Sequence, residues 1–186
     1  MEFDFSDIKL CIFDLDGTLV NSHYEEIPYF FSQLSQQLKC PIDNDISHYP
    51  QRTFSSVINQ VAPHEQQQLL FSAMDNIMYE FVFAHSWQAL DMGTSLLKCV
   101  QKKQINYLVV TGNYVRASLM KAEKAGLELS EEKIYATTPD LDSKYHLIQQ
   151  LMDKHQCLPH EVLSVGDSEY DERTAMNLGV RFIKVD

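Results

Sequence analysis

The chain has 186 residues, and its apolar fraction of 45% and charged fraction of 22% are ordinary for a protein that buries a core. This length fits one core domain with a modest insertion rather than two full-size domains. The formal net charge of −11 argues against binding to nucleic acid or to an anionic membrane surface, because both partners favour a basic protein face.

The four cysteines are scattered without a Cys-x-x-Cys spacing, which is typical of reduced thiols. The first residues, MEFDFSDIKL, lack the basic start and the apolar run of a signal peptide. No stretch approaches the roughly 18 apolar residues that a membrane-spanning helix needs. We therefore expect a cytoplasmic protein with no membrane span.

The first predicted strand is the apolar run Ile8–Phe13, which ends at the turn sequence Asp-Leu-Asp-Gly-Thr. Over residues 20–90 apolar residues recur near the helical period, and prolines divide the stretch into several helices. Because this stretch interrupts the chain directly after the first strand, we predict that residues 20–90 form a helical cap. The core then consists of residues 1–19 and 91–186.

Beyond Gly93, strands alternate with helices. The predicted helices are Thr94–Lys103, Asn113–Ala125, Ser143–Lys154 and Ser168–Leu178, and the predicted strands are Ile105–Val110, Lys133–Ala136, Glu161–Val165 and Val180–Val185. Gly126 and Gly179 follow two helices, where glycine is favoured as a C-terminal cap. Asp142 or Ser143 is the expected N-cap of the third helix. The alternation predicts an α/β fold with a parallel sheet and right-handed crossovers.

Polar residues gather where the predicted strands end, and the carboxyl ends of parallel strands form the active crevice of an open sheet. They are Asp14 and Asp16 after the first strand, Thr111, Gly112 and Asn113 after the second, Lys144 after the third, and Gly166, Asp167, Ser168 and Asp171 after the fourth. Burying several carboxylates together without a counter-charge is costly. We therefore expect a divalent cation and Lys144 to balance them.

Each of these residues also has an ordinary structural interpretation when it is taken alone. The Asp-Leu-Asp-Gly-Thr segment consists largely of turn-forming residues, and it does not follow the spacing of an EF-hand calcium loop. Thr111 alone fits a hydroxyl at a strand end, Lys144 a solvated helix residue, and Asp171 a carboxylate near the positive end of a helix dipole. The ordered set favours function because its members converge on one crevice.

Four short segments stand out along the chain: FDLDGTLVNS, VVTGN, the lysine of DSKYHLI, and VGDSEYDERTAMNLGV. In this order they resemble the four motifs of the haloacid-dehalogenase-like hydrolase superfamily, and the first and fourth are the specific ones. The helical insertion resembles the small caps of the phosphoglycolate phosphatase and β-phosphoglucomutase branch. The resemblance covers the whole chain. It implies a doubly wound, five-stranded parallel sheet in the order 5-4-1-2-3.

The resemblance also implies a Mg²⁺-dependent phosphatase that works through an aspartyl-phosphate intermediate. Asp14 is then the nucleophile. Asp16 protonates the leaving oxygen and later deprotonates the attacking water. Lys144 offsets the negative charge between the nucleophile and the phosphate.

Two further sets of residues follow from the same resemblance. The implied phosphate-binding residues are Thr111, Gly112, Asn113 and Lys144. The implied metal ligands are Asp14, Asp16 through its backbone carbonyl, Asp167 and Asp171. For Asp171 two roles are open, because it either reaches the metal, directly or through water, or orients Lys144.

We expect the substrate to be a small soluble phosphate ester, and the sequence does not name it. Apart from its histidines, the predicted cap contains only two cationic residues, Lys39 and Arg52. A second acidic group on the substrate would pair well with a guanidinium. Arg52 is therefore a candidate contact for the non-reacting end of the substrate, and an ordinary surface arginine is the alternative.

Other functions are open at this stage. A phosphomutase has the same four motifs and differs in its cap. A true haloacid dehalogenase lacks the second carboxylate, which is present here as Asp16. A receiver domain carries its phosphorylated aspartate after the third strand, where this chain has Thr137, Thr138 and Pro139. A catalytically silent interaction protein does not require the complete set of motifs.

Overall fold

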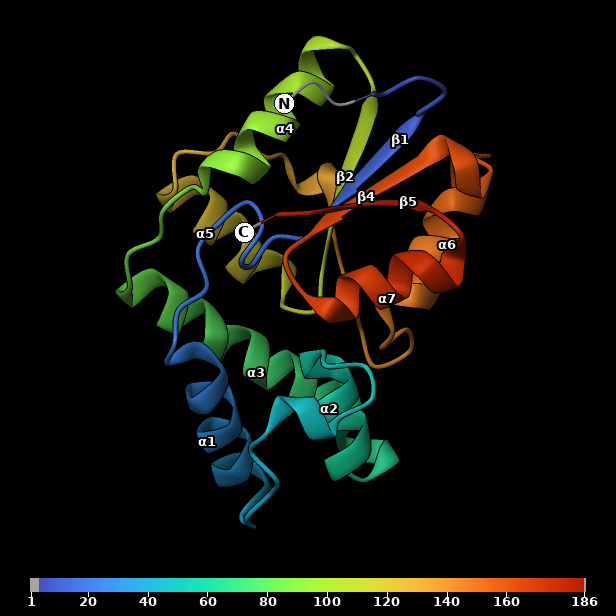
Figure 1. The fold of residues 1–186 in the computed structure, drawn as a ribbon. Coiled ribbons are helices and arrows are strands. Elements are labelled where there is room, and N and C mark those ends of the chain that lie inside the picture. The colour runs from blue at the N-terminus through green and yellow to red at the C-terminus, as the bar shows by residue number, and fades with distance from the viewer. Residues whose placement is uncertain (1–3, 186) are drawn as a thin grey trace.

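A computed structural model describes residues 4–185. Figure 1 shows a central sheet with helices on both sides and a separate layer of helices, α1, α2 and α3, below it. Among the described residues, no helix combines the length and the apolar character that crossing a membrane requires. The cytoplasmic location stays a prediction.

The sheet has five parallel strands in the order β3-β2-β1-β4-β5, which confirms the expected order. The strands are β1 (Leu10–Phe13), β2 (Asn106–Thr111), β3 (Ile134–Ala136), β4 (Val162–Gly166) and β5 (Arg181–Lys184). Phe13 at the end of β1 pairs with Val109 of β2 and with Val165 of β4. The residues that follow these three strands therefore start from neighbouring points on one edge of the sheet.

Four helices cover the faces of the sheet, α4 (Asp91–Lys102) and α5 (Val115–Lys124) on one side and α6 (Lys144–Lys154) and α7 (Glu169–Leu178) on the other (Figure 1). Side chains alternate across β1. Cys11 and Phe13 belong to the hydrophobic cluster on the α4 and α5 side, whereas Leu10 and Ile12 belong to the cluster on the α6 and α7 side. Because both faces are covered, β1 is apolar without interruption.

The helical insertion after β1 is confirmed. It contains α1 (Glu26–Leu38), α2 (Phe54–Val61) and α3 (His64–Ala84), and the chain also has short 3₁₀ helices at Ile46–His48, Glu131–Lys133 and Pro159–Glu161. Within the cap, Phe30 of α1 stacks on Phe54 of α2 with 3.9 Å between the ring centroids. Helix α3 packs against α5 of the core. The division of the chain at residues 20 and 90 stays a prediction.

The predicted helix boundaries agree with the structure except near two glycines. Helix α4 begins at Asp91, so Gly93 lies inside the helix rather than before it. A Cβ on Gly93 would lie 1.9 Å from the carbonyl oxygen of Thr18, and the absence of a side chain therefore lets α4 pack against the first motif. Helix α5 ends at Lys124, with Ala125 rather than Gly126 as its C-cap.

Candidate active site

The residues that the sequence predicts as functional lie around one cavity of about 240 Å³ between the sheet edge and the cap. Its lining includes Asp14, Asp16, Thr111, Gly112, Asn113, Lys144, Asp167 and Asp171. The structure therefore brings all of the predicted site residues together.

A tight turn after β1 positions the two acidic residues of the first motif. Gly17 has a φ of +83°, in the left-handed region that favours glycine. A Cβ at this position would lie only 2.3 Å from Oδ2 of Asp167. Gly17 thus lets the backbone of the first motif approach the carboxylate of the fourth motif closely.

Lys144, the first residue of α6, links the first and fourth motifs. Its ammonium group donates to Oδ1 of Asp14 at 2.6 Å and to Oδ1 of Asp171 at 2.9 Å. All three side chains are buried. Ser168, the N-cap of α7, also donates from its hydroxyl to Oδ2 of Asp171 at 2.5 Å. Lys144 therefore bonds to Asp14 and Asp171 at once. Whether Asp171 reaches a metal or orients Lys144 stays a prediction.

Burial and charge set the protonation of this group. Burial is the main cause that raises the pKa of Asp14 to about 8, the charges of Asp171 and Asp16 add to the shift, and Lys144 opposes it. Burial alone would lower the pKa of Lys144, but Asp14 and Asp171 outweigh it and raise that pKa. Burial would raise the pKa of Asp171, yet Lys144 and Ser168 lower it. The single positive charge of Lys144 therefore does not balance the negative charges around Asp14.

Three carboxylates could hold a cation at this point. Asp14, Asp167 and Asp171 each place one oxygen within 4.8 Å of the others. Oxygen donors with excess negative charge fit a hard divalent cation such as Mg²⁺. The carboxylate of Asp16 is not part of this group. Its backbone carbonyl stays a predicted ligand.

Thr111 and Gly112 line the cavity at the end of β2. The Thr111 hydroxyl accepts the Asn113 N–H at 3.1 Å, so its own O–H is left to donate to a ligand. The Gly112 carbonyl accepts the N–H of Phe54 at 3.0 Å, which seats the start of α2 on the second motif. The Asn113 amide donates to Oε1 of Glu26 at 2.7 Å, and its role in phosphate binding stays a prediction.

Two buried charged residues lie outside the sequence motifs, Lys121 of α5 and Glu26 of α1. The ammonium of Lys121 is fully buried, contacts the carboxylate of Asp16, and lies 2.6 and 2.8 Å from the two carboxylate oxygens of Glu26. It also lies 4.5 Å from the ring centroid of Trp87. The only signal in the sequence is that Lys121 follows Ala117 by one helical turn, on the buried face of α5.

This second lysine ties the cap to the predicted general acid. Burial alone would lower the pKa of Lys121, but Asp16 and Glu26 outweigh it and raise that pKa. Burial raises the pKa of Glu26, and the charge of Asp16 adds to the shift. Because Glu26 belongs to the cap and Lys121 to the core, the orientation of Asp16 depends on contact between the two parts.

The family model described as haloacid dehalogenase-like hydrolase matches residues 11–185. The chain therefore belongs to this family of hydrolases, as its four motifs indicate. No curated protein gives a significant match.

Solved structures share the fold at low sequence identity. A hydrolase from Pseudomonas syringae is 19% identical with a TM-score of 0.69, over 95% of this chain and 83% of that one. CbbY from Rhodobacter sphaeroides, solved in complex with phosphate, is 14% identical with a TM-score of 0.72, over 95% and 85%. A predicted phosphoglycolate phosphatase from Haemophilus somnus is 16% identical with a TM-score of 0.60, over 96% and 85%.

The raised pKa of Asp14 leads to a prediction about metal binding. Without a metal, Asp14 takes up a proton as the pH falls through about 8, and a cation must displace that proton. We expect Mg²⁺ to raise the melting temperature more at about pH 9 than at about pH 6. Thermal melting with and without Mg²⁺ measures this, and Asp14→Asn should weaken the pH dependence. A Mg²⁺ effect that is larger at the lower pH would contradict it.

The buried Lys121 leads to a second prediction. Lys121→Met leaves the buried carboxylate of Glu26 and the partly exposed carboxylate of Asp16 without their cation, so the free energy of unfolding should fall by about 3 kcal/mol or more. Adding Glu26→Gln should recover part of this loss, because it removes one of the unpaired charges. Urea unfolding measures both changes. Lys98→Met, on the exposed face of α4, is the control and should stay within about 0.5 kcal/mol of wild type. If Lys121→Met lowers the free energy of unfolding by no more than about 0.5 kcal/mol, the contacts of Lys121 with Asp16 and Glu26 do not stabilise the fold.

Proposed function

We propose that this hydrolase is a Mg²⁺-dependent phosphatase that cleaves a small phosphomonoester through an aspartyl-phosphate intermediate. The observation that carries the proposal is the pair of hydrogen bonds from Lys144 to Asp14 and Asp171, in a buried site with Asp167 close by. A carboxylate that attacks an anionic phosphate needs positive charge around it. The complex of CbbY with phosphate supports the same class of ligand.

The residues divide the reaction into two steps. In the first step a carboxylate oxygen of Asp14 attacks phosphorus, the bond to the leaving oxygen breaks, and Asp16 gives that oxygen a proton. In the second step water attacks the phosphorus of the aspartyl-phosphate, Asp16 takes the proton from the water, and inorganic phosphate leaves Asp14 free. Lys144 and the Thr111 hydroxyl hold the phosphoryl oxygens throughout. A bound Mg²⁺ would offset the charge of the phosphoryl group and orient it for attack.

The cavity supports a small substrate. Its volume is about 240 Å³, and cap residues including His23, Ile27, Ile46 and Arg52 complete its lining. Because α2 of the cap is hydrogen-bonded to Gly112 at the end of β2, the cap lies directly over the phosphate-binding wall. Water is then limited near the nucleophile during the first step.

The nucleophile gives the decisive test. Asp14→Asn is nearly isosteric, but an amide is a far poorer nucleophile and an uncharged metal ligand, so kcat should fall by several powers of ten, about 5 kcal/mol or more. The melting temperature should stay the same or rise slightly, because one crowded carboxylate is gone. Steady-state turnover of a panel of phosphate esters measures the first effect.

The matched control for this test is Asp140→Asn, which changes an exposed aspartate in the loop after β3 and should leave turnover unaltered. Turnover by Asp14→Asn within tenfold of wild type would mean that Asp14 is not the nucleophile. Wild-type protein that interconverts two isomers of a sugar phosphate, and releases no inorganic phosphate, would instead identify a phosphomutase.

Asp16 gives an independent prediction for the role of the acid. A poor leaving group needs the proton and a good one does not, so Asp16→Asn should slow an alkyl phosphate by about 100-fold or more and 4-nitrophenyl phosphate much less. The ratio of kcat/KM for the two substrates measures the difference. Equal losses on both substrates would remove Asp16 from the acid role.

A further inference from the structure

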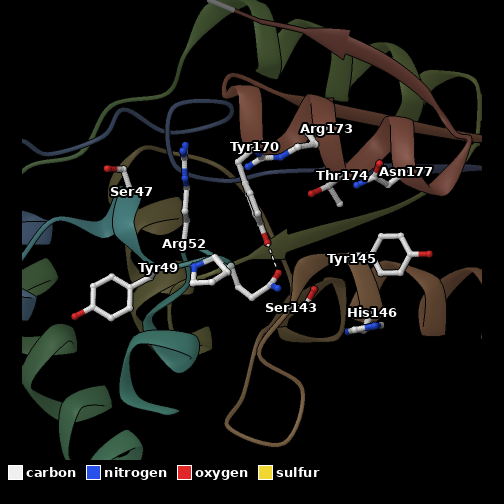
Figure 2. A pocket seen from close by; sticks show the side chains of 12 residues that line it. Ser47, Tyr49, Arg52, Ser143, Tyr145, His146, Tyr170, Arg173, Thr174 and Asn177 are labelled. Carbon is white, nitrogen blue, oxygen red and sulfur yellow. Dashed lines mark hydrogen bonds between the residues drawn. The ribbon is translucent and has the colours of Figure 1, made fainter. Parts of the chain in front are cut away.

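A second cavity lies beside the catalytic one, and its volume of about 780 Å³ is larger. Figure 2 shows that its side chains come from three segments, the cap loop before α2, the start of α6, and α7. Arg52 belongs to the cap loop, His146 to α6, and Arg173 to α7. We call this cavity the α6–α7 groove. None of the residues described above as catalytic lines it.

The charge of the α6–α7 groove differs from that of the whole molecule. The chain carries a net charge of −11. Among the described residues, those that line the groove include two arginines and a histidine and no aspartate or glutamate. Hydroxyl and amide groups supply the rest of its polar lining, for example Ser143, Thr174 and Asn177. Such a lining favours an anionic ligand.

The two arginines of the groove are the ones whose guanidinium groups have no hydrogen-bond or ion-pair partner in the described part of the chain. The sequence contains four arginines, and Arg116 bonds to Asn76 while Arg181 bonds to a backbone carbonyl. Within residues 4–185, the guanidinium groups of Arg52 and Arg173 form no hydrogen bond and no ion pair. Arg52 also adopts a φ of +48°, in the left-handed region that a non-glycine residue rarely occupies. Both guanidinium groups are therefore available to a ligand.

The groove adjoins the catalytic cavity. Arg52 and Tyr170 line both of them. Nζ of Lys144 and the guanidinium carbon of Arg173 each lie 6.0 Å from the centroid of the Tyr170 ring. The Tyr170 hydroxyl donates to Oε1 of Gln51 at 3.3 Å, which joins α7 to the cap loop (Figure 2). Tyr170 and Arg52 thus lie at the border between the two cavities.

We propose that the α6–α7 groove is a second anion site, in which Arg173, with Arg52 at its inner edge, binds a phosphoryl group separate from the one at Asp14. A guanidinium matches two phosphoryl oxygens at once. The group belongs either to the far end of a bisphosphorylated substrate or to a free phosphate ion. The first case rests on the proposed function, because it requires an ester bound at Asp14.

The test uses the Asp14→Asn protein with Mg²⁺, so that esters bind without turnover. Calorimetric titration compares butyl phosphate with the bisphosphates of alkanediols of increasing length. Above a certain length the bisphosphates should bind about tenfold more tightly than butyl phosphate. Adding Arg173→Gln should abolish this gain. Arg116→Gln, which changes an exposed arginine on α5, is the matched control and should preserve it.

A second titration identifies the source of the phosphoryl group. Inorganic phosphate is added to the same protein saturated with butyl phosphate, with and without Arg173→Gln. If inorganic phosphate binds in a way that depends on Arg173, and the bisphosphates bind no more tightly than butyl phosphate, the site takes a free phosphate ion. Affinities for the bisphosphates and for inorganic phosphate that are both independent of Arg173 would overturn the proposal.

The experiments distinguish a failure of the proposed phosphatase function from a failure of the proposed anion site. In the first case wild-type protein hydrolyses no ester and butyl phosphate does not bind, while binding of inorganic phosphate still depends on Arg173. Thermal melting of Arg173→Gln checks the fold, which should be unaffected because Arg173 is exposed.

Discussion

Carboxylates from the ends of β1 and β4 meet at one edge of the sheet, and the ammonium group of Lys144 lies between two of them, Asp14 and Asp171. Without this cation the mutual repulsion of buried carboxylates would work against the packing of α6 and α7 on the sheet. With it the charge is still incompletely balanced, since burial keeps the pKa of Asp14 at about 8. The same imbalance that limits stability makes the site receptive to a divalent cation, which favours the ionised form of Asp14.

A second buried lysine repeats this arrangement on the other side of the site. Lys144 holds Asp14, the proposed nucleophile, and Lys121 holds Asp16, the proposed acid, together with Glu26 of the cap. Asp14 and Asp16 are only two positions apart in the sequence, yet each contacts a different lysine from a different helix. This separation supports two different roles for them, because the lysine beside Asp14 comes from α6 and the one beside Asp16 comes from α5.

Much of the fold and site could be predicted because the information is local. The apolar run of β1, the turn at Gly17 and the alternation of strands and helices each depend on a few neighbouring residues. The active crevice follows from topology, since parallel strands put their carboxyl ends on one edge. Gly93 was placed incorrectly before α4 because its role is a contact with Thr18, which is distant in sequence. Local signals do not report such an approach of two backbone segments.

The sequence by itself determined the class of fold through its alternating strands and helices, and its four motifs indicated the hydrolase family. It also marked Asp14, Thr111, Lys144 and Asp167 as candidate site residues, because they follow predicted strands. Only the tertiary structure decided the pairing of charges. Lys121 looks like any helical lysine until the packing of α5 under the cap buries it beside Asp16. Likewise, Arg52 and Arg173 are 121 positions apart in the sequence. They line one groove only because the cap loop lies next to α7. The sequence specifies which charges exist, but burial and distance determine which of them interact.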